Sequence, residues 1–222
     1  MPEFTLAGAI KAADELSTNL SFPKINKVFD YQKNKNISSQ YIEPRGCLIE
    51  AIRRQGKKVV IKYIPASEAD GAFPDLTVSI TRKDRNGVYC ISIDQRCSFC
   101  ARRFAGVKEL LHVYFDILER SPAIQEITDT LSDAINSRRV IGEKGQDDND
   151  IVLSGEAFCY IVAIEILLPF GEYRSHVENE HDPGNGKNDY YTALMTRIPS
   201  SVIYFYFSKF RAFSSRLHGE GF

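Results

Sequence analysis

The segment Lys108–His112 has residue types and a spacing that suit metal-dependent hydrolysis. It reads KELLH, which differs from the zinc-binding pattern HExxH only in its first residue. Side chains at positions i and i+4 of a helix lie one turn apart on one face, so two histidines at this spacing can hold one zinc ion while the glutamate polarises the metal-bound water. In this chain Glu109 and His112 keep their places in the pattern, and Lys108 takes the place of the first histidine.

Lys108 changes the chemistry that this pattern can support. An ammonium group has three hydrogen-bond donors and no lone pair, so it cannot bind zinc until it loses a proton. With an unperturbed pKa of about 10.4, that loss is unfavourable at neutral pH. Catalytic zinc normally has three protein ligands and a water molecule, so the lysine argues against tight metal binding here.

Two long helices are expected to position these residues. From Cys100 to Glu119 apolar residues recur at intervals of three and four, which predicts a helix buried along one broad face. A second, strongly apolar helix is predicted at Ser154–Pro169, with Ser154 as its N-cap. The other expected elements are the helices Leu6–Leu20, Gly46–Gln55, Ala123–Ser137, Tyr190–Thr196 and Ser200–Phe213, the strands Lys57–Ile64, Leu76–Ile80 and Val88–Ile93, and a hairpin turn at Asn86–Gly87.

Polar stretches separate these elements. Residues 1 to about 44 are polar and mixed, and the stretch YQKNKNISSQ at Tyr31–Gln40 reads as a loop or a poorly ordered arm. Gly142–Asp150 and residues 172–189 are charged or polar and are predicted to be exposed loops. Basic pairs such as Arg102-Arg103 are typical of helix ends or solvated faces.

The composition is that of an ordinary soluble globular protein. The 222 residues include 28 Lys and Arg against 29 Asp and Glu, and 43% are hydrophobic. The near-neutral balance argues against direct nucleic-acid binding, and the apolar stretches are shorter than the roughly 20 residues that cross a membrane. The first residues lack the pattern of a signal peptide, so a cytoplasmic location is expected.

The five cysteines are an odd number in a chain of this length, which argues against a full disulfide framework and favours reduced thiols. Cys97 and Cys100 form one CxxC pair, and no second pair follows at the spacing of a zinc finger. We expect these two residues to be reduced and to pack as small apolar side chains, in preference to a zinc or redox role.

Most of the chain, from about residue 45 to residue 213, resembles the ImmA/IrrE-like metallopeptidases, which cleave or inactivate regulatory repressors. The metal-site helix of that family resembles RRFxxAHExxH and follows a strand of the type IxVN; this chain has RRFAGVKELLH at Arg102–His112 after ISID at Ile91–Asp94. A second family segment resembles ExxANxFAAELLMP, and Glu156–Pro169 reads EAFCYIVAIEILLP. A third, VPxxxV, is similar to IPSSV at Ile198–Val202.

The resemblance implies a zincin-like domain of the α+β class, in which a small mixed β-sheet packs on the active-site helix and the second helix crosses it. That domain would span residues 45–213, after an N-terminal arm with a short helix (1–44) and before a C-terminal tail (214–222). The family's site consists of zinc, two histidines, a glutamate that opens the second segment, and the HExxH glutamate as general base.

When the roles of the family's site residues are transferred to the matching positions of this chain, the resemblance implies that His112 and Glu156 are metal ligands and that Glu109 is the base. Lys108 then stands at a degenerate ligand position. Its ammonium is predicted to take the place of the cation by pairing with Glu156 and with Glu109. Such pairing would keep the buried carboxylates compensated, because an unpaired buried charge destabilises a protein by about 3–5 kcal/mol.

Three functions follow, and the first is favoured. It is a regulatory protein of the ImmA/IrrE type that binds a protein partner with weak or no proteolysis. The second is an active zinc endopeptidase that cleaves a regulatory protein and takes a third ligand from Asp116, His176 or His181, although an acidic residue at 116 more often supports a ligand than binds the metal. The third is a phage or toxin–antitoxin module that assembles, or forms homo-oligomers, through the aromatic segment Tyr204–Phe213. None of these involves a membrane.

Overall fold

The protein belongs to the α+β class. Its computed structural model describes residues 4–31, 35–65, 79–117, 152–169 and 192–205, together with Glu68. Within these residues the helices are α1 (Leu6–Leu20), α2 (Arg45–Arg54), α4 (Phe99–Phe115), α6 (Gly155–Leu167) and α9 (Ser200–Phe205), and the strands are β1 (Lys24–Tyr31), β2 (Lys35–Ile42), β3 (Lys58–Ile64), β4 (Ser79–Lys83) and β5 (Val88–Asp94). Residues 192–196 are also helical.

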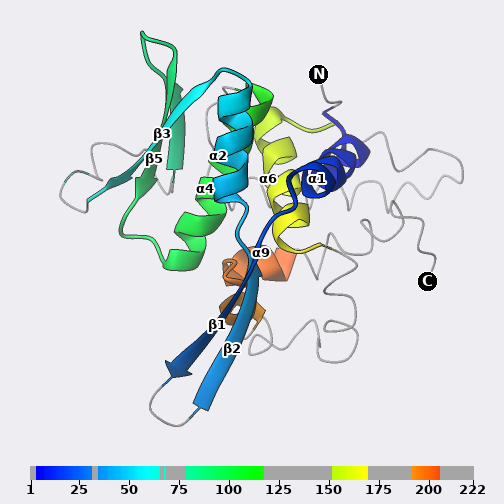
Figure 1. Cartoon of the computed structure of the whole chain (residues 1–222), viewed down its shortest axis with the longest axis vertical. Coiled ribbons are helices and arrows are strands. Elements are labelled where there is room, and N and C mark those ends of the chain that lie inside the picture. Colours follow the sequence, from blue (N-terminus) through cyan, green and yellow to red (C-terminus); the bar gives the residue numbers. More distant parts are fainter. Residues whose placement is uncertain are drawn as a thin grey trace, which may run out of the picture.

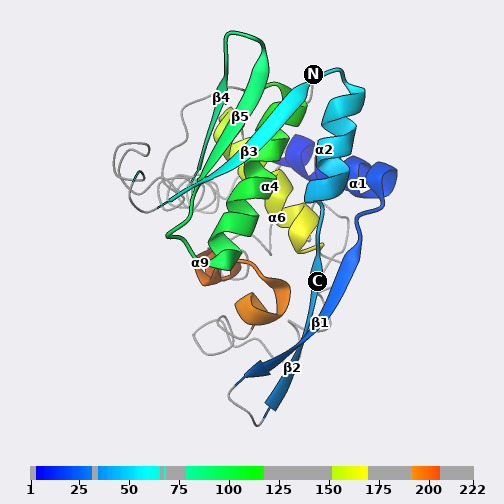
Figure 2. The same ribbon diagram turned by 60° about the vertical axis from the view of Figure 1, so that its left-hand side comes forward.

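A mixed three-stranded sheet covers one side of α4. Its strand order is β3-β5-β4, with β3 parallel and β4 antiparallel to the central strand β5 (Figure 2). Tyr89, Ile91 and Ile93 alternate along β5 and are buried, so one face of the sheet faces the helices. Gly87 lies in the tight turn between β4 and β5 with a φ of 77°, a left-handed conformation that favours glycine.

Helix α6 forms the centre of the molecule. All of its residues are buried, and it lies between α1 and α4 (Figure 1). Ser154 caps its first turn by accepting a hydrogen bond from the backbone N–H of Ala157, as the sequence predicts. A helix that is apolar on all sides requires neighbours on all sides, and this requirement places α6 in the core.

Helix α4 packs between the sheet and α6, and α2 packs against α4 and β3. Residues 103–113 of α4 are all buried. The helix ends earlier than Glu119, because Asp116 adopts a left-handed conformation with a φ of 61°. Lys57, which precedes β3, donates hydrogen bonds to the carbonyl oxygens of Val113 and Tyr114 at 2.8 and 3.0 Å and so satisfies the end of α4.

Most of the predicted elements in the described residues are confirmed. The helix Leu6–Leu20 has the predicted bounds, and the predicted helix at 46–55, the strands at 57–64 and 88–93, and the helix that begins at Ser154 differ from the structure by one or two residues. The strand predicted at Leu76–Ile80 continues to Lys83, and its first three residues lie outside the described residues. The predictions for residues 118–151, 170–191 and 206–222 also lie outside them.

The prediction of a loop between the first two helices is wrong. Strands β1 and β2 form an antiparallel hairpin with eight residue pairs, from Lys24 opposite Ile42 to Tyr31 opposite Lys35. The hairpin projects away from the helices (Figure 1). A two-stranded ribbon is held by backbone pairing and does not require a regular apolar face. The polar sequence of this segment therefore lacks the alternating apolar pattern from which strands are predicted.

None of the helices in the described residues is both long enough and apolar enough to cross a membrane.

The prediction that Arg103 lies at a helix end or on a solvated face is also wrong. Its side chain is 0% exposed. Its guanidinium donates hydrogen bonds to the carbonyl oxygens of Thr196 and Arg197, at 3.1 and 2.9 Å, and to that of Ile42. Arg103 therefore ties α4 both to the end of the hairpin and to the segment that precedes α9.

Replacing Arg103 with lysine is expected to lower the free energy of unfolding by about 3 kcal/mol. A single ammonium cannot reproduce the fork of a guanidinium, so the charge stays buried and poorly paired. The matched control is Arg102→Lys on the same turn of α4, where the side chain is only partly buried and the expected change is within about 0.5 kcal/mol. Urea unfolding measures the free energy of unfolding of both variants. Equal losses in the two would show that the hydrogen bonds of Arg103 do not hold α4 to the hairpin and to the segment before α9.

Candidate functional site

Four ionisable side chains meet in the interior between α4 and α6. Lys108, Glu109 and His112 come from α4, and Glu156 comes from the first turn of α6. All four are between 1% and 3% exposed. Lys108 and His112 stand four residues apart and so share one face of α4, whereas Glu156 reaches them from the N-terminal end of α6, where a negative charge is favourable.

Lys108 lies between the two carboxylates. Its Nζ donates a hydrogen bond to Oε1 of Glu156 and lies 3.1 Å from Oε1 of Glu109. Burial alone would lower the pKa of Lys108, but Glu109 and Glu156 outweigh it, so the pKa is raised and the ammonium stays charged.

His112 completes the cluster on the other side of Glu156. Its Nε2 lies 2.6 Å from Oε2 of Glu156, and its Nδ1 lies 3.2 Å from the carbonyl oxygen of Ile117. Burial lowers the pKa of His112, but the carboxylate of Glu156 that its ring contacts outweighs burial and raises that pKa. Burial in turn raises the pKa of Glu156, but His112 and Lys108 lower it to about 2.

The charges in this cluster balance. Lys108 and His112 are positive, and Glu109 and Glu156 are negative, so the interior holds no net charge. A buried charge is tolerated when it is paired and hydrogen-bonded, and each of these four side chains meets that condition.

Glu109 is held by hydroxyl groups from the sheet. Ser79 donates a hydrogen bond to its Oε1 at 2.7 Å, and Thr81 donates to its Oε2 at 2.5 Å. The pKa of Glu109 is lowered because Lys108 and His112 outweigh the effect of burial. Both carboxylate oxygens are therefore engaged, which leaves Glu109 poorly placed to take a proton from a water molecule as a general base would.

Two members of this site, Ser79 and Thr81, were missed by the sequence reasoning. Ser79 and Thr81 lie two residues apart on β4, so they face the same side, but a short polar alternation in a strand gives no sign of which helix it meets. Cys159 lies one turn after Glu156 on α6, and its thiol is beside His112. Burial raises the pKa of Cys159, against the effect of His112, so the thiol is neutral at pH 7.

The described residues do not fit zinc. Catalytic zinc normally has three protein ligands, whereas here one of the three places of the pattern is taken by the Lys108 ammonium, which has no lone pair, beside Nε2 of His112 and a carboxylate oxygen of Glu156. The other oxygen of Glu156 is occupied by Lys108. Within the described ranges no three or more His, Cys, Asp or Glu side chains gather as a metal-binding group.

Of the three proposed third ligands, the structure describes Asp116, and this residue does not join the cluster. Asp116 is exposed at the end of α4, where its carboxylate accepts a hydrogen bond from the hydroxyl of Tyr89. It is not one turn further along the face of His112, because the helix has ended. His176 and His181 lie outside the described residues.

Two other sequence predictions concern cysteines and aromatic residues. Cys97 and Cys100 are free thiols, and both are half-buried rather than fully packed in the core. Of the segment Tyr204–Phe213, the structure describes the first two residues: Tyr204 is 54% exposed and Phe205 is buried. The remainder of this segment lies outside the described residues.

Comparison of this chain with profiles of known protein families, with curated proteins and with solved structures found no match.

Replacing Lys108 with methionine is expected to lower the free energy of unfolding by about 3–5 kcal/mol, because it leaves buried carboxylates without their cation. Adding Glu156→Gln to that variant should recover more than about 1 kcal/mol relative to the sum of the two single changes. Urea unfolding of the two single variants and the double variant at neutral pH measures this coupling.

The matched control for this cycle is the exposed pair of Arg54 and Glu50 on α2, whose atoms lie 3.3 Å apart. Arg54→Met should change the free energy of unfolding by less than about 0.5 kcal/mol, because exposed ion pairs contribute little. A Lys108→Met variant as stable as Arg54→Met would show that the buried ammonium is not needed.

Proposed function

We propose that this chain is a regulatory protein with an ImmA/IrrE-like, zincin-like domain whose metal centre has become an ion-pair cluster, and that it acts by binding a protein partner without proteolysis. The observation that carries the proposal is the place of Lys108. Its ammonium contacts both carboxylates of the site at the position where the HExxH pattern has a metal ligand.

The arrangement of elements supports the same proposal. A small mixed sheet packs on α4, which carries the KELLH segment, and α6 brings Glu156 to that segment from the other side. His112 and Glu156 are 44 positions apart in the chain, and they are in contact. The resemblance implies such a contact, because it makes both residues ligands of one metal ion. A chance match to HExxH gives no reason for a distant glutamate to arrive at this face.

The loss of proteolysis follows from the chemistry of the four side chains. Water activation in a zincin needs a metal with an open position and a free carboxylate next to it. Here Lys108 supplies a fixed charge without an open coordination position, and both oxygens of Glu109 accept hydrogen bonds from β4. The cluster therefore stabilises the domain, and the activity of the protein has to come from its surface.

Metal content before and after one substitution tests the proposal. Protein purified without chelator is expected to hold far less than one zinc ion per chain, and Lys108→His is expected to raise the content toward one. The second substitution His112→Ala, made in the Lys108→His background, should remove that zinc, because it deletes one of the ligands. Lys108→Gln is the matched control, since it removes the ammonium without adding a strong ligand.

A peptidase assay on the same samples completes the test. Unmodified protein should not cleave a broad mixture of peptides, with or without added zinc. The proposal is wrong if the unmodified protein already contains one zinc ion per chain and loses it in His112→Ala, particularly if chelator-sensitive cleavage accompanies the metal.

A further inference from the structure

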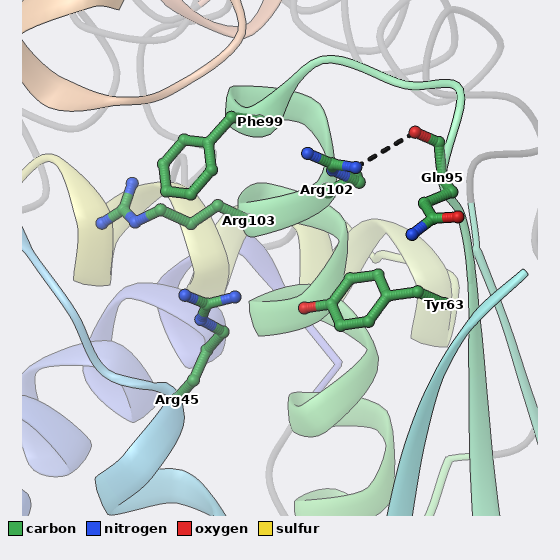
Figure 3. Close-up of a pocket in the computed structure, with 6 residues that line it drawn as sticks. All are labelled: Arg45, Tyr63, Gln95, Phe99, Arg102 and Arg103. Carbon is green, nitrogen blue, oxygen red and sulfur yellow. Dashed lines mark hydrogen bonds between the residues drawn. The ribbon is translucent and has the colours of Figure 1, made fainter. Parts of the chain in front are cut away.

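An arginine-rich cavity lies at the N-terminal end of α4 (Figure 3). Its volume is about 320 Å³, and it is lined by Arg45, Tyr63, Gln95, Phe99, Arg102 and Arg103. These residues come from the start of α2, the end of β3, the turn after β5 and the first turns of α4. None of them belongs to the buried ion-pair cluster, so the cavity is a separate feature of the molecule.

The cavity carries an excess of two positive charges. Three arginines line it, and one carboxylate, Glu43, lies beside them. Glu43 accepts hydrogen bonds from Nε and Nη2 of Arg45 at 2.7 and 2.8 Å, and its Oε2 lies 3.7 Å from Nε of Arg103. Asp94, at the end of β5, adds no net charge because it pairs with Arg96 at 2.7 Å.

Several N–H groups of these arginines have no acceptor in the part of the chain that the structure describes. Arg102 donates one hydrogen bond, from Nη1 to the carbonyl oxygen of Gln95 at 3.0 Å, and its other donors make none there. Nη1 of Arg45 is likewise unused, because Glu43 occupies only one side of the guanidinium. Nε of Arg103 makes no hydrogen bond, but it is buried and lies 3.7 Å from Oε2 of Glu43, so the donors open to a ligand are those of Arg45 and Arg102.

The electrostatics at this end of α4 favour an anion. The first turn of α4 has no acidic residue, so the partial positive charge of the helix end adds to that of the arginines. Burial, opposed by Glu43 and assisted by the neighbouring charge of Arg45, lowers the pKa of Arg103 to about 10. A bound anion would relieve this crowding of positive charge.

Two aromatic rings complete the cavity. Tyr63 and Phe99 are each 45% exposed, which is high for side chains of this size. Figure 3 shows the hydroxyl of Tyr63 pointing across the cavity toward the guanidinium of Arg45. Exposed rings beside a cluster of arginines are suited to a ligand that combines a planar ring with a negative charge, because the ring can stack while the charge is paired.

We propose that this cavity binds a nucleoside monophosphate, with its phosphate held by Arg45 and Arg102 and its base against Tyr63 and Phe99. A phosphate monoester carries a charge of about −1.5 to −2 at pH 7, which matches the charge excess of the cavity, whereas a carboxylate would leave part of it uncompensated. Guanidinium groups bind phosphate through paired hydrogen bonds. The volume lies at the lower end of the range of about 300–1,000 Å³ for small-molecule sites, as a mononucleotide requires. This proposal does not depend on the proposed function.

Isothermal titration calorimetry of the full chain with AMP, GMP, CMP and UMP tests the site. At least one of these nucleotides should bind at a stoichiometry of one, and its nucleoside and inorganic phosphate should each bind about tenfold more weakly or worse, since each supplies half of the contacts. Arg102→Gln should weaken nucleotide binding by about tenfold or more, the loss expected for a charge-assisted hydrogen bond. Tyr63→Leu should weaken nucleotide binding without changing the affinity for inorganic phosphate.

The matched control is Arg85→Gln, which makes the same change of residue type in the exposed turn at the opposite end of β5 and should leave binding unchanged. Because Arg102 is only partly buried and Tyr63 is exposed, these variants are expected to fold, and urea unfolding checks that they do. The proposal is overturned if no nucleotide binds, if the nucleoside or inorganic phosphate binds as tightly as the nucleotide, or if Arg102→Gln and Arg85→Gln behave alike.

Discussion

The fold depends on neutralising two carboxylates in the interior between α4 and α6. Glu109 and Glu156 have almost no contact with solvent, and a buried carboxylate without a partner would be strongly destabilising. Lys108 satisfies both at once, and His112 takes the remaining oxygen of Glu156. The central helix can therefore begin with a charged residue and still be buried along its whole length. Residues in a sequence pattern that suits a divalent cation thus form a cluster without net charge.

Helix α4 connects this cluster with the other special features of the molecule. Its N-terminal turns carry Arg103, which holds the hairpin end and the segment before α9, and they form part of the arginine-rich cavity. Its middle carries the ion-pair cluster, and its end is closed by hydrogen bonds from Lys57. The middle of α4 and its N-terminal end therefore differ. The charges in the middle are balanced and buried, whereas the N-terminal end presents an excess of positive charge to the cavity.

The sequence predicts the elements around the site well, because their signals are local. The apolar periodicity of α4, the Ser154 cap and the alternation along β5 all depend on residues close together in the chain. The pairing of Lys108 with Glu156 could also be anticipated, since it follows from charge once a family likeness places the two segments together. The hairpin β1–β2, the burial of Arg103 and the hydroxyls that hold Glu109 could not, because each is determined by contacts between distant segments.

Crystals of the unmodified protein can be grown with excess zinc, and diffraction measured on both sides of the zinc absorption edge then shows whether zinc or the Lys108 ammonium neutralises Glu156. We expect no anomalous peak between His112 and Glu156, and electron density that joins the ammonium of Lys108 to the carboxylate of Glu156. An ordered zinc ion bound to both His112 and Glu156, with Lys108 turned away from them, would contradict this expectation.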